Sequence, residues 1–264
     1  LSGGTMKLAQ GDFGIEGAFT ATSVEFSIAC NKPIVETAYY DRNKVTVTYN
    51  GMNQQINTQV EYYALTLASA DGVTSVSKSA DGPVYAFTDL TFAEKQNVTL
   101  VLNGSDMKPL SFGNLIHNNV GNIVYAGTNQ QIQIFGNHNV PGYDADGKLE
   151  NRVNYHQLTV DANSMAYADA TLQAATLNVL NDGRLELRND ANLLVEKLNS
   201  YSVDAEGNLT GEFGTVAYVG NKQIVSTIDT TKDGNALKYG HLEIGGNGDK
   251  VAENGLVVKG DLFF

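Results

Sequence analysis

The chain has 264 residues, 42% of them hydrophobic, so it is long enough to bury one large β core or two ordinary ones. Its 17 Lys and Arg against 29 Asp and Glu give a formal net charge of -12, which repels nucleic-acid phosphates and anionic lipid head groups. We therefore expect no nucleic-acid partner, and no apolar run is long enough for a membrane-spanning segment.

Residues 1–110 alternate apolar and polar side chains, which is the pattern of half-buried strands. The alternation is clearest in Val24/Phe26/Ile28, Val45/Val47/Tyr49, Tyr63/Leu65/Leu67 and Val98/Leu100/Leu102. Dipeptides such as Asn50-Gly51 and Asp81-Gly82 separate these runs and tolerate the positive φ of hairpins and tight turns. Strands spaced in this way favour an antiparallel sandwich. The segment Pro83 to Leu102 is similar to strands of immunoglobulin-like modules, so we expect an immunoglobulin-like sandwich domain over 1–110.

Two pairs of adjacent tyrosines lie in this first domain, Tyr39-Tyr40 and Tyr62-Tyr63. Neighbouring side chains of a strand point to opposite faces, so one ring of each pair should face outward. An outward ring can stack against a sugar, which makes these four tyrosines a candidate ligand surface. The alternative is that each outward ring packs against a side chain of the next strand.

The alternation is interrupted at Lys108–Gly113, and we place a second domain over 111–264. A repeated unit occurs three times between Gln157 and Phe213, anchored by Val160, Val179 and Val203. Each unit consists of a short run of alternating apolar residues, a turn of small or acidic residues, and a second run. This spacing suits solenoid coils, which stack to bury their apolar faces. We expect an all-β chain whose second half is a right-handed β-helix-like solenoid or a second sandwich. A short helix within Met165–Leu198 is the local alternative, because that stretch is rich in alanine and has leucines at helical spacing.

The run Leu177-Asn-Val179 followed by Asn181-Asp-Gly-Arg-Leu-Glu-Leu187 resembles coils of β-solenoid cell-surface proteins of Gram-negative bacteria, of the adhesin, passenger and surface-layer types. The resemblance implies a non-enzymatic role in adhesion or coat formation, and a secreted or outer-surface location. It also implies a partner that is a protein or glycan on a cell surface, or further copies of the chain. The chain begins at Leu1, so we expect any signal segment to be missing from it.

Arg184, Glu186 and Arg188 should point to one face of their strand. They have two interpretations: a solvated ion-pair ladder, or part of the site of a β-helix enzyme that degrades polysaccharide. A glycosidase needs two carboxylates across a cleft, and a lyase needs calcium beside a basic residue. We favour the ladder, and we expect no resident cofactor.

Calcium remains an alternative at two acidic turns, Asp144–Gly147 and Gly245–Asp249, which we interpret as plain turns. At the other end of the second domain, Leu262, Phe263 and Phe264 form a large apolar segment. This segment either pairs within its own domain or docks as a strand onto another copy.

Overall fold

The computed structural model describes residues 5–8, 14–20, 25–28, 34–39, 46–69, 72–94, 96–134, 154–227 and 236–264, with the strands before residue 46 described by their backbone alone. Every regular element in these residues is a β-strand, which confirms the all-β prediction. The described residues divide into two compact units: unit 1 runs up to Ile123, and unit 2 comprises Val124–Ile134 and the residues from 154 onward.

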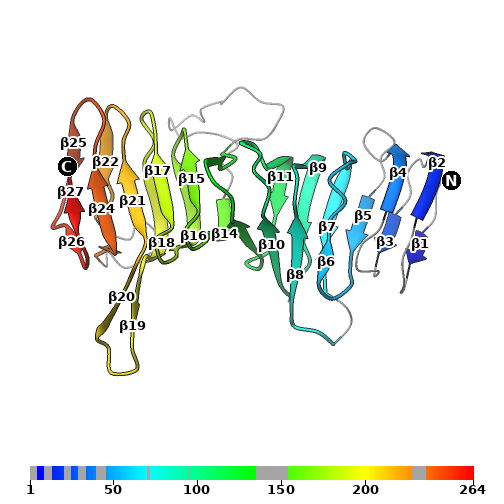
Figure 1. Ribbon diagram of the computed structural model, residues 1–264, viewed down its shortest axis with the longest axis horizontal. Coiled ribbons are helices and arrows are strands. Elements are labelled where there is room, and N and C mark those ends of the chain that lie inside the picture. Colours follow the sequence, from blue (N-terminus) through cyan, green and yellow to red (C-terminus); the bar gives the residue numbers. More distant parts are fainter. Residues whose placement is uncertain are drawn as a thin grey trace. The chain divides into compact units, whose positions relative to one another are not determined.

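Unit 1 is a parallel β-solenoid, in which every other strand along the chain joins the same sheet (Figure 1). One sheet has the order β1-β3-β5-β7-β9-β11, a second face pairs β6 with β8 and β8 with β10, and β2 pairs with β4. The strands are β1 (Thr5–Leu8), β2 (Gly14–Thr20), β3 (Glu25–Ile28), β4 (Ile34–Tyr39), β5 (Thr46–Tyr49), β6 (Gln54–Gln55), β7 (Ala64–Leu67), β8 (Ser75–Ala80), β9 (Val84–Phe92), β10 (Asn97–Leu102) and β11 (Leu110–Ile116). The boundary between the units falls within β12 (Asn122–Tyr125).

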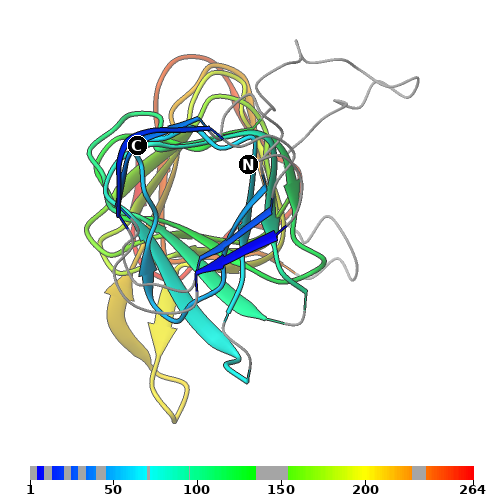
Figure 2. The ribbon, with the colours of Figure 1, turned by 90° about the vertical axis from the view of Figure 1, so that its right-hand side faces the viewer.

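The interior of unit 1 is a stack of aligned side chains from successive coils. In the register of the sheet, Val47 lies beside Leu65 and Leu65 beside Leu90, and all three are fully buried. Figure 2 shows the chain winding around this interior. Because each coil covers only its neighbours, the apolar face of one coil is buried by the next.

The antiparallel pairing expected for the first domain is wrong where the structure describes it, and the immunoglobulin-like sandwich is not confirmed. The strands of unit 1 pair in parallel, from β5 with β7 through β9 with β11. Asp81-Gly82 does not close a hairpin but turns a corner between β8 and β9, which belong to different sheets. Alternation with a period of two indicates only that one face of a strand is buried. Dipeptides that tolerate a positive φ suit solenoid corners as well as hairpins. Neither pattern therefore distinguishes parallel from antiparallel pairing.

Unit 2 is a second parallel solenoid built in the same way. Its largest sheet has the order β13-β15-β17-β21-β24-β27, and another face pairs β14 with β16 and β16 with β18. Two further pairs are β22 with β25 and β23 with β26. The strands are β13 (Gln130–Gln131), β14 (Asn154–Val160), β15 (Met165–Ala168), β16 (Leu172–Val179), β17 (Arg184–Leu187), β18 (Leu193–Asn199), β19 (Tyr201–Val203), β20 (Leu209–Phe213), β21 (Thr215–Tyr218), β22 (Gln223–Val225), β23 (Lys238–Tyr239), β24 (His241–Ile244), β25 (Lys250–Ala252), β26 (Val257–Val258) and β27 (Leu262–Phe263).

Two of the three sequence repeats are true coils. Val160 lies beside Val179 in the register of β14 and β16, as the repeat predicts, and both are buried. The helix weighed for Met165–Leu198 is wrong, because the stretch forms β15 to β18. Its alanines are accommodated on strands that are covered by neighbouring coils, where Ala166, Ala168 and Ala174 are buried.

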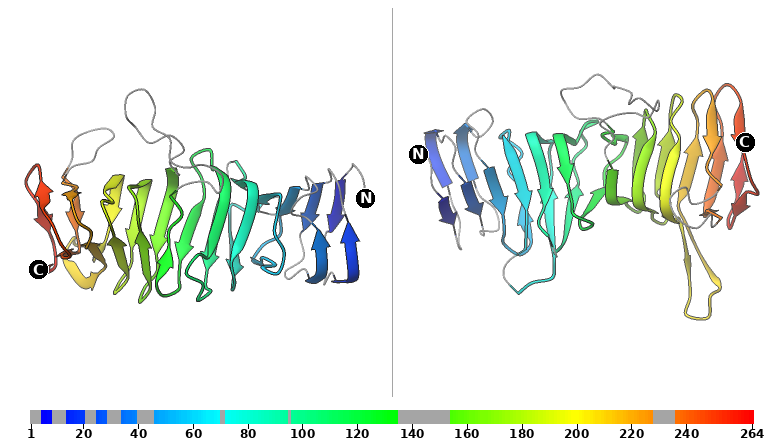
Figure 3. Two further views of the ribbon diagram at one scale, coloured as in Figure 1. Left: turned by 90° about the horizontal axis from the view of Figure 1, so that it is seen from above. Right: turned by 180° about the vertical axis from the view of Figure 1, so that it is seen from behind.

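The third repeat is a different structure, an antiparallel hairpin of β19 and β20 that projects from unit 2 (Figure 3). Val203 is 51% exposed in this hairpin, where the repeat predicted a buried anchor. The carboxylate of Asp204 accepts the N–H groups of Glu206 and Asn208, and Gly207 adopts a φ of 85°. This acidic turn with its positive-φ glycine closes a hairpin in preference to a solenoid corner.

A corner that the sequence reading missed recurs three times, at Tyr49–Asn57, Tyr125–Gln133 and Tyr218–Ser226. We call it the tyrosine–glutamine corner. In each copy a glycine N–H donates to the side-chain carbonyl of the glutamine three residues later: Gly51 to Gln54 at 2.7 Å, Gly127 to Gln130 at 2.9 Å and Gly220 to Gln223 at 2.8 Å. The glutamine thereby satisfies a backbone donor at the bend, where the strand ladder is interrupted.

The tyrosine of each corner pairs with a second buried tyrosine. The hydroxyls of Tyr49 and Tyr62 are 2.8 Å apart, and those of Tyr218 and Tyr239 are 3.1 Å apart. In the middle corner the hydroxyl of Tyr125 is buried and has no hydrogen-bond partner among the described residues. The second hydroxyl then donates to the backbone carbonyl that ends the corner, that of Asn57, Gln133 or Ser226. In the first and third corners both buried hydroxyls are therefore satisfied, whereas in the middle corner only that of Tyr155 is.

Two of the three corners also carry a lysine on the following coil. Lys78 is fully buried, and its ammonium donates to the carbonyl oxygens of Gly51 and Met52 at 2.7 and 3.1 Å and to Gln54 Oε1 at 2.5 Å. Lys250 donates in the same way to the carbonyls of Gly220 and Asn221, at 2.9 and 3.2 Å, from a partly exposed position. At the middle corner the matching position, opposite Gln130, is Ala166.

Candidate functional site

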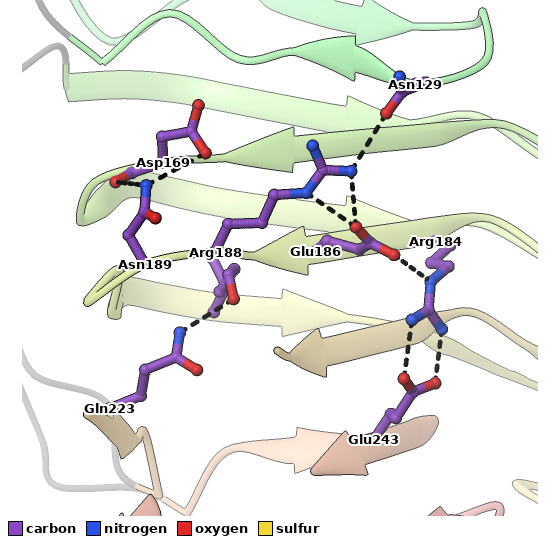
Figure 4. Close-up of polar contacts among 9 residues, drawn as sticks. Asn129, Asp169, Arg184, Glu186, Arg188, Asn189, Gln223 and Glu243 are labelled. Carbon is purple, nitrogen blue, oxygen red and sulfur yellow. Dashed lines mark hydrogen bonds and ion pairs between the residues drawn. The ribbon is translucent and has the colours of Figure 1, made fainter. Parts of the chain in front are cut away.

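The outward face of the main sheet of unit 2 carries a network of charged side chains, shown in Figure 4. Arg184 and Glu186 of β17 and Arg188, which directly follows it, lie on one face, as their alternation predicts. Glu186 accepts from Arg184 Nε at 2.9 Å through one carboxylate oxygen and from Arg188 NH2 at 2.8 Å through the other. The three residues thus form the expected ladder.

The network extends to a carboxylate that the sequence reading did not include. Arg184 makes a bidentate pair with Glu243 of β24, at 2.7 and 2.9 Å. Between these two strands lies β21, where Ala217 occupies the register position between Glu186 and Glu243. The small side chain of Ala217 lets Arg184 reach across the strand, and Ala217 itself is fully buried.

Arg188 holds the other end of the network. Its guanidinium carbon lies 3.6 Å from the centroid of the Tyr167 ring on β15, and its NH2 donates to Asn129 Oδ1 at 3.1 Å. Asn129 has a φ of 57°, a left-handed turn conformation that asparagine tolerates better than most residues. The cation–π contact and the hydrogen bonds fix the guanidinium in one orientation.

The electrostatics of the network favour fully charged carboxylates. Burial raises the pKa of Glu186, but the hydrogen bonds from Arg184 and Arg188 outweigh it and hold the pKa below its ordinary value. The hydrogen bond from Arg184 likewise holds the pKa of Glu243 below its ordinary value, against a smaller opposing effect of burial. A glycosidase acid needs the opposite, a raised pKa that keeps its proton near neutral pH. Neither carboxylate is therefore suited to donate a proton in catalysis.

The tyrosine candidates separate into an inner and an outer residue. Tyr62 is fully buried in its corner, so its assignment to a ligand surface is wrong: a hydroxyl that can reach two buried partners favours the inward orientation. Tyr63 points outward, and its ring stacks on Phe87 with 6.0 Å between centroids. Tyr39 lies on β4 with its side chain outside the described residues, and Tyr40 lies outside them altogether.

Two exposed aromatic residues of β9 complete the surface around Tyr63, and sequence reasoning missed both. Tyr85 and Phe87 are 38% and 47% exposed, whereas Val84 and Ala86, which alternate with them, are fully buried. The alternation of Pro83–Leu90 carried this signal, because only one parity of a strand can face the core. We call Tyr63, Tyr85 and Phe87 the aromatic strip.

The segment Leu262–Phe264 pairs within its own unit. Leu262 and Phe263 form β27, in parallel register with Leu242 and Glu243 of β24. Phe263 lies beside His241, with ring centroids 5.6 Å apart, and His241 Nδ1 accepts the N–H of Asp261 at 2.8 Å. Phe264 is 93% exposed in this chain, and docking of the segment onto another copy stays a prediction.

Of the two turns considered as calcium loops, the structure describes only Gly245–Asp249. Gly246 and Gly248 adopt φ angles of 74° and 82° in the second turn, and Asp144–Gly147 lies outside the described residues. Within the described ranges, no three His, Cys, Asp or Glu side chains gather as they would around a metal ion. The same ranges contain no helix of the length and apolarity that a bilayer crossing requires.

Comparisons of the chain with protein-family models, with curated proteins and with solved structures find no match.

Proposed function

We propose that this chain is a non-enzymatic β-solenoid of the bacterial cell-surface type, secreted or displayed outside the cell, that presents flat faces for adhesion. The parallel coils described above support this proposal, together with the resemblance of Leu177–Leu187 to coils of such proteins. Because parallel strands joined by a crossover almost always wind in one sense, we infer that the coils are right-handed.

The ion-pair network is the observation that carries the proposal. Both carboxylates are matched by arginines, and Arg184 spans three strands of the sheet. A network that closes on itself in this way stiffens a face against distortion, and it leaves no carboxylate with the raised pKa of a general acid. The aromatic strip gives a second candidate function, polysaccharide binding, because exposed rings on a flat sheet suit stacking.

The test compares attachment with degradation. Beads coated with the purified chain should attach to immobilised cell-surface proteins or glycans, and uncoated beads should not. In parallel, the chain is incubated with neutral and acidic polysaccharides, and released reducing ends and unsaturated sugars are measured. Release of either product by the wild-type chain, abolished in Glu186→Gln, would identify a degrading enzyme and refute the proposal.

A further inference from the structure

The aromatic strip is held rigidly by the sheet beneath it. The N–H of Phe87 donates to the Tyr62 carbonyl and the N–H of Thr88 to the Tyr63 carbonyl, at 2.7 and 2.8 Å. The Thr88 hydroxyl also donates to the Tyr63 carbonyl at 2.7 Å. The rings of Tyr63 and Phe87 meet at an interplanar angle of 28°, close to parallel. The strip is therefore a preformed platform that requires little ordering when a ligand binds.

A glycine of the neighbouring strand β11 lies beside Phe87. The register of β11 shifts between Phe112 and Asn114, which places Gly113 at a bulge beside Phe87 and Thr88. A Cβ at Gly113 would overlap the carbonyl oxygen of Thr88, so only glycine fits there. Consequently no side chain from position 113 covers the Phe87 ring, which is 47% exposed although it is large and apolar.

The residues around the strip are polar or acidic. Ser111 lies opposite Tyr85 in the register of β11, and the bridge between Tyr62 and Ala86 places the exposed Glu61 on the other side of Tyr85. Beyond Phe87, Asn114 donates to the carboxylate of Asp89 at 2.9 Å. Hydroxyl and carboxylate groups at the rim of an aromatic platform match the hydroxyls that ring a sugar. With a formal net charge of -12 on the chain, the same carboxylates disfavour an anionic ligand.

We propose that the aromatic strip binds a neutral polysaccharide, whose pyranose rings stack on Phe87, Tyr63 and Tyr85 while the rim groups accept hydrogen bonds from sugar hydroxyls. Tyr63 and Phe87 belong to neighbouring coils, and Tyr85 and Phe87 are two positions apart on one strand. Each of several successive sugar rings can therefore contact a different aromatic side chain of the strip. This inference rests on the proposed function, since it names the ligand class of one adhesive face.

The experiment is affinity electrophoresis of the folded chain in native gels that contain hydroxyethylcellulose, galactomannan or, as the anionic comparison, polygalacturonate. We expect retardation by at least one neutral polymer, and about a tenfold weaker apparent affinity in Phe87→Ala. Phe263→Ala is the matched control, because Phe263 of unit 2 is 44% exposed. Far-UV circular dichroism and thermal melts establish that each variant is folded.

Four outcomes would overturn the proposal: no retardation by either neutral polymer, retardation by polygalacturonate alone, equal retardation of Phe87→Ala and wild type, or equal weakening by Phe263→Ala. A change in oligomeric state of Phe87→Ala, measured by light scattering, would instead assign the strip to contact between copies. Failure here is separable from failure of the proposed function. Coated beads that still attach to cell-surface proteins would retain adhesion and exclude only the sugar platform.

Discussion

Replacement of Lys78 by methionine should change the stability of unit 1 in a manner that depends on pH. Burial lowers the pKa of Lys78 from 10.5 to about 7 in the folded chain. Below pH 7 both the folded and the unfolded chain carry the proton, and the folded state bears the full cost of a buried charge. Between about pH 7 and 10.5 the folded chain releases the proton while the unfolded chain keeps it, so the free energy of unfolding rises with pH.

The magnitude follows from the size of the pKa shift. Well above the folded pKa each pH unit adds about 1.4 kcal/mol to the free energy of unfolding. Because only half of the folded chains have released the proton at pH 7, the gain between pH 7 and 9 is about 2 kcal/mol. Methionine has a similar length and no proton to release. The difference in unfolding free energy between wild type and Lys78→Met should therefore move by about 2 kcal/mol in favour of wild type as the pH rises from 7 to 9.

The assay is urea denaturation at several pH values between 6 and 9, followed by tyrosine fluorescence, since the chain has 13 Tyr and no Trp. Lys250→Met is the matched control, because it removes the same kind of hydrogen bonds from a partly exposed corner. A difference between wild type and Lys78→Met that stays constant over this pH range would refute the reasoning. It would mean that the three oxygen acceptors around Lys78 hold the ammonium charged despite its burial.

Three further substitutions test other contacts. Glu243→Gln should lower the free energy of unfolding by about 1 kcal/mol at neutral pH, because the Arg184 hydrogen bond lowers the pKa of the Glu243 carboxylate in the folded chain. This contribution should disappear as the pH falls from the ordinary carboxyl pKa of 4.5 through the lowered pKa of the folded chain. Chemical denaturation at pH 7 and pH 3 checks this. Gly220→Ala should lower the free energy of unfolding by more than about 3 kcal/mol or prevent folding, because the added Cβ would overlap the Asn189 carbonyl. Gly255→Ala is its control: no atom lies within 4 Å of a Cβ at that position, so the melting temperature should stay nearly unchanged. Tyr62→Phe should cost about 1 kcal/mol in guanidinium denaturation, since it leaves the part-buried carbonyl of Asn57 without its donor. A neutral result would contradict the role of the tyrosine pair.

Alternation in the sequence was sufficient to predict strands and their inward residues. Val47 and Leu65 were assigned to one face by parity, and both are fully buried. Parity says nothing about the direction of the neighbouring strand, so the parallel pairing of β5 and β7 could not be read from it. Direction is decided by the corners, whose glutamines and paired tyrosines depend on residues in other coils.

The tyrosine–glutamine corner did leave a sequence signal, Tyr-x-Gly-x-x-Gln. It begins at Tyr49, Tyr125 and Tyr218, several coils apart, so a search for a period of one coil passes over it. Glu243 left no such signal. It meets Arg184 only because β21 and β24 follow β17 in the sheet, and the chain between them includes a hairpin that the periodicity does not anticipate.

That hairpin begins and ends at nearly the same point of the solenoid. The N–H of Gly214 donates to the carbonyl of Ser200 at 2.9 Å, so the residues on either side of β19 and β20 already meet across its base. β21 then pairs with β17 in unbroken register, from Arg184 beside Thr215 to Leu187 beside Tyr218. Because the entropic cost of closing a loop grows only slowly with its length, we expect this corner to accept a longer excursion, provided that its ends return together. We therefore expect residues 202–212 to be a replaceable cassette, where a foreign loop or epitope tag can be carried while the ladder on either side stays intact. Phe213 is retained, because its carbonyl accepts the N–H of Asp182 and its ring lies 4.9 Å from that of His241.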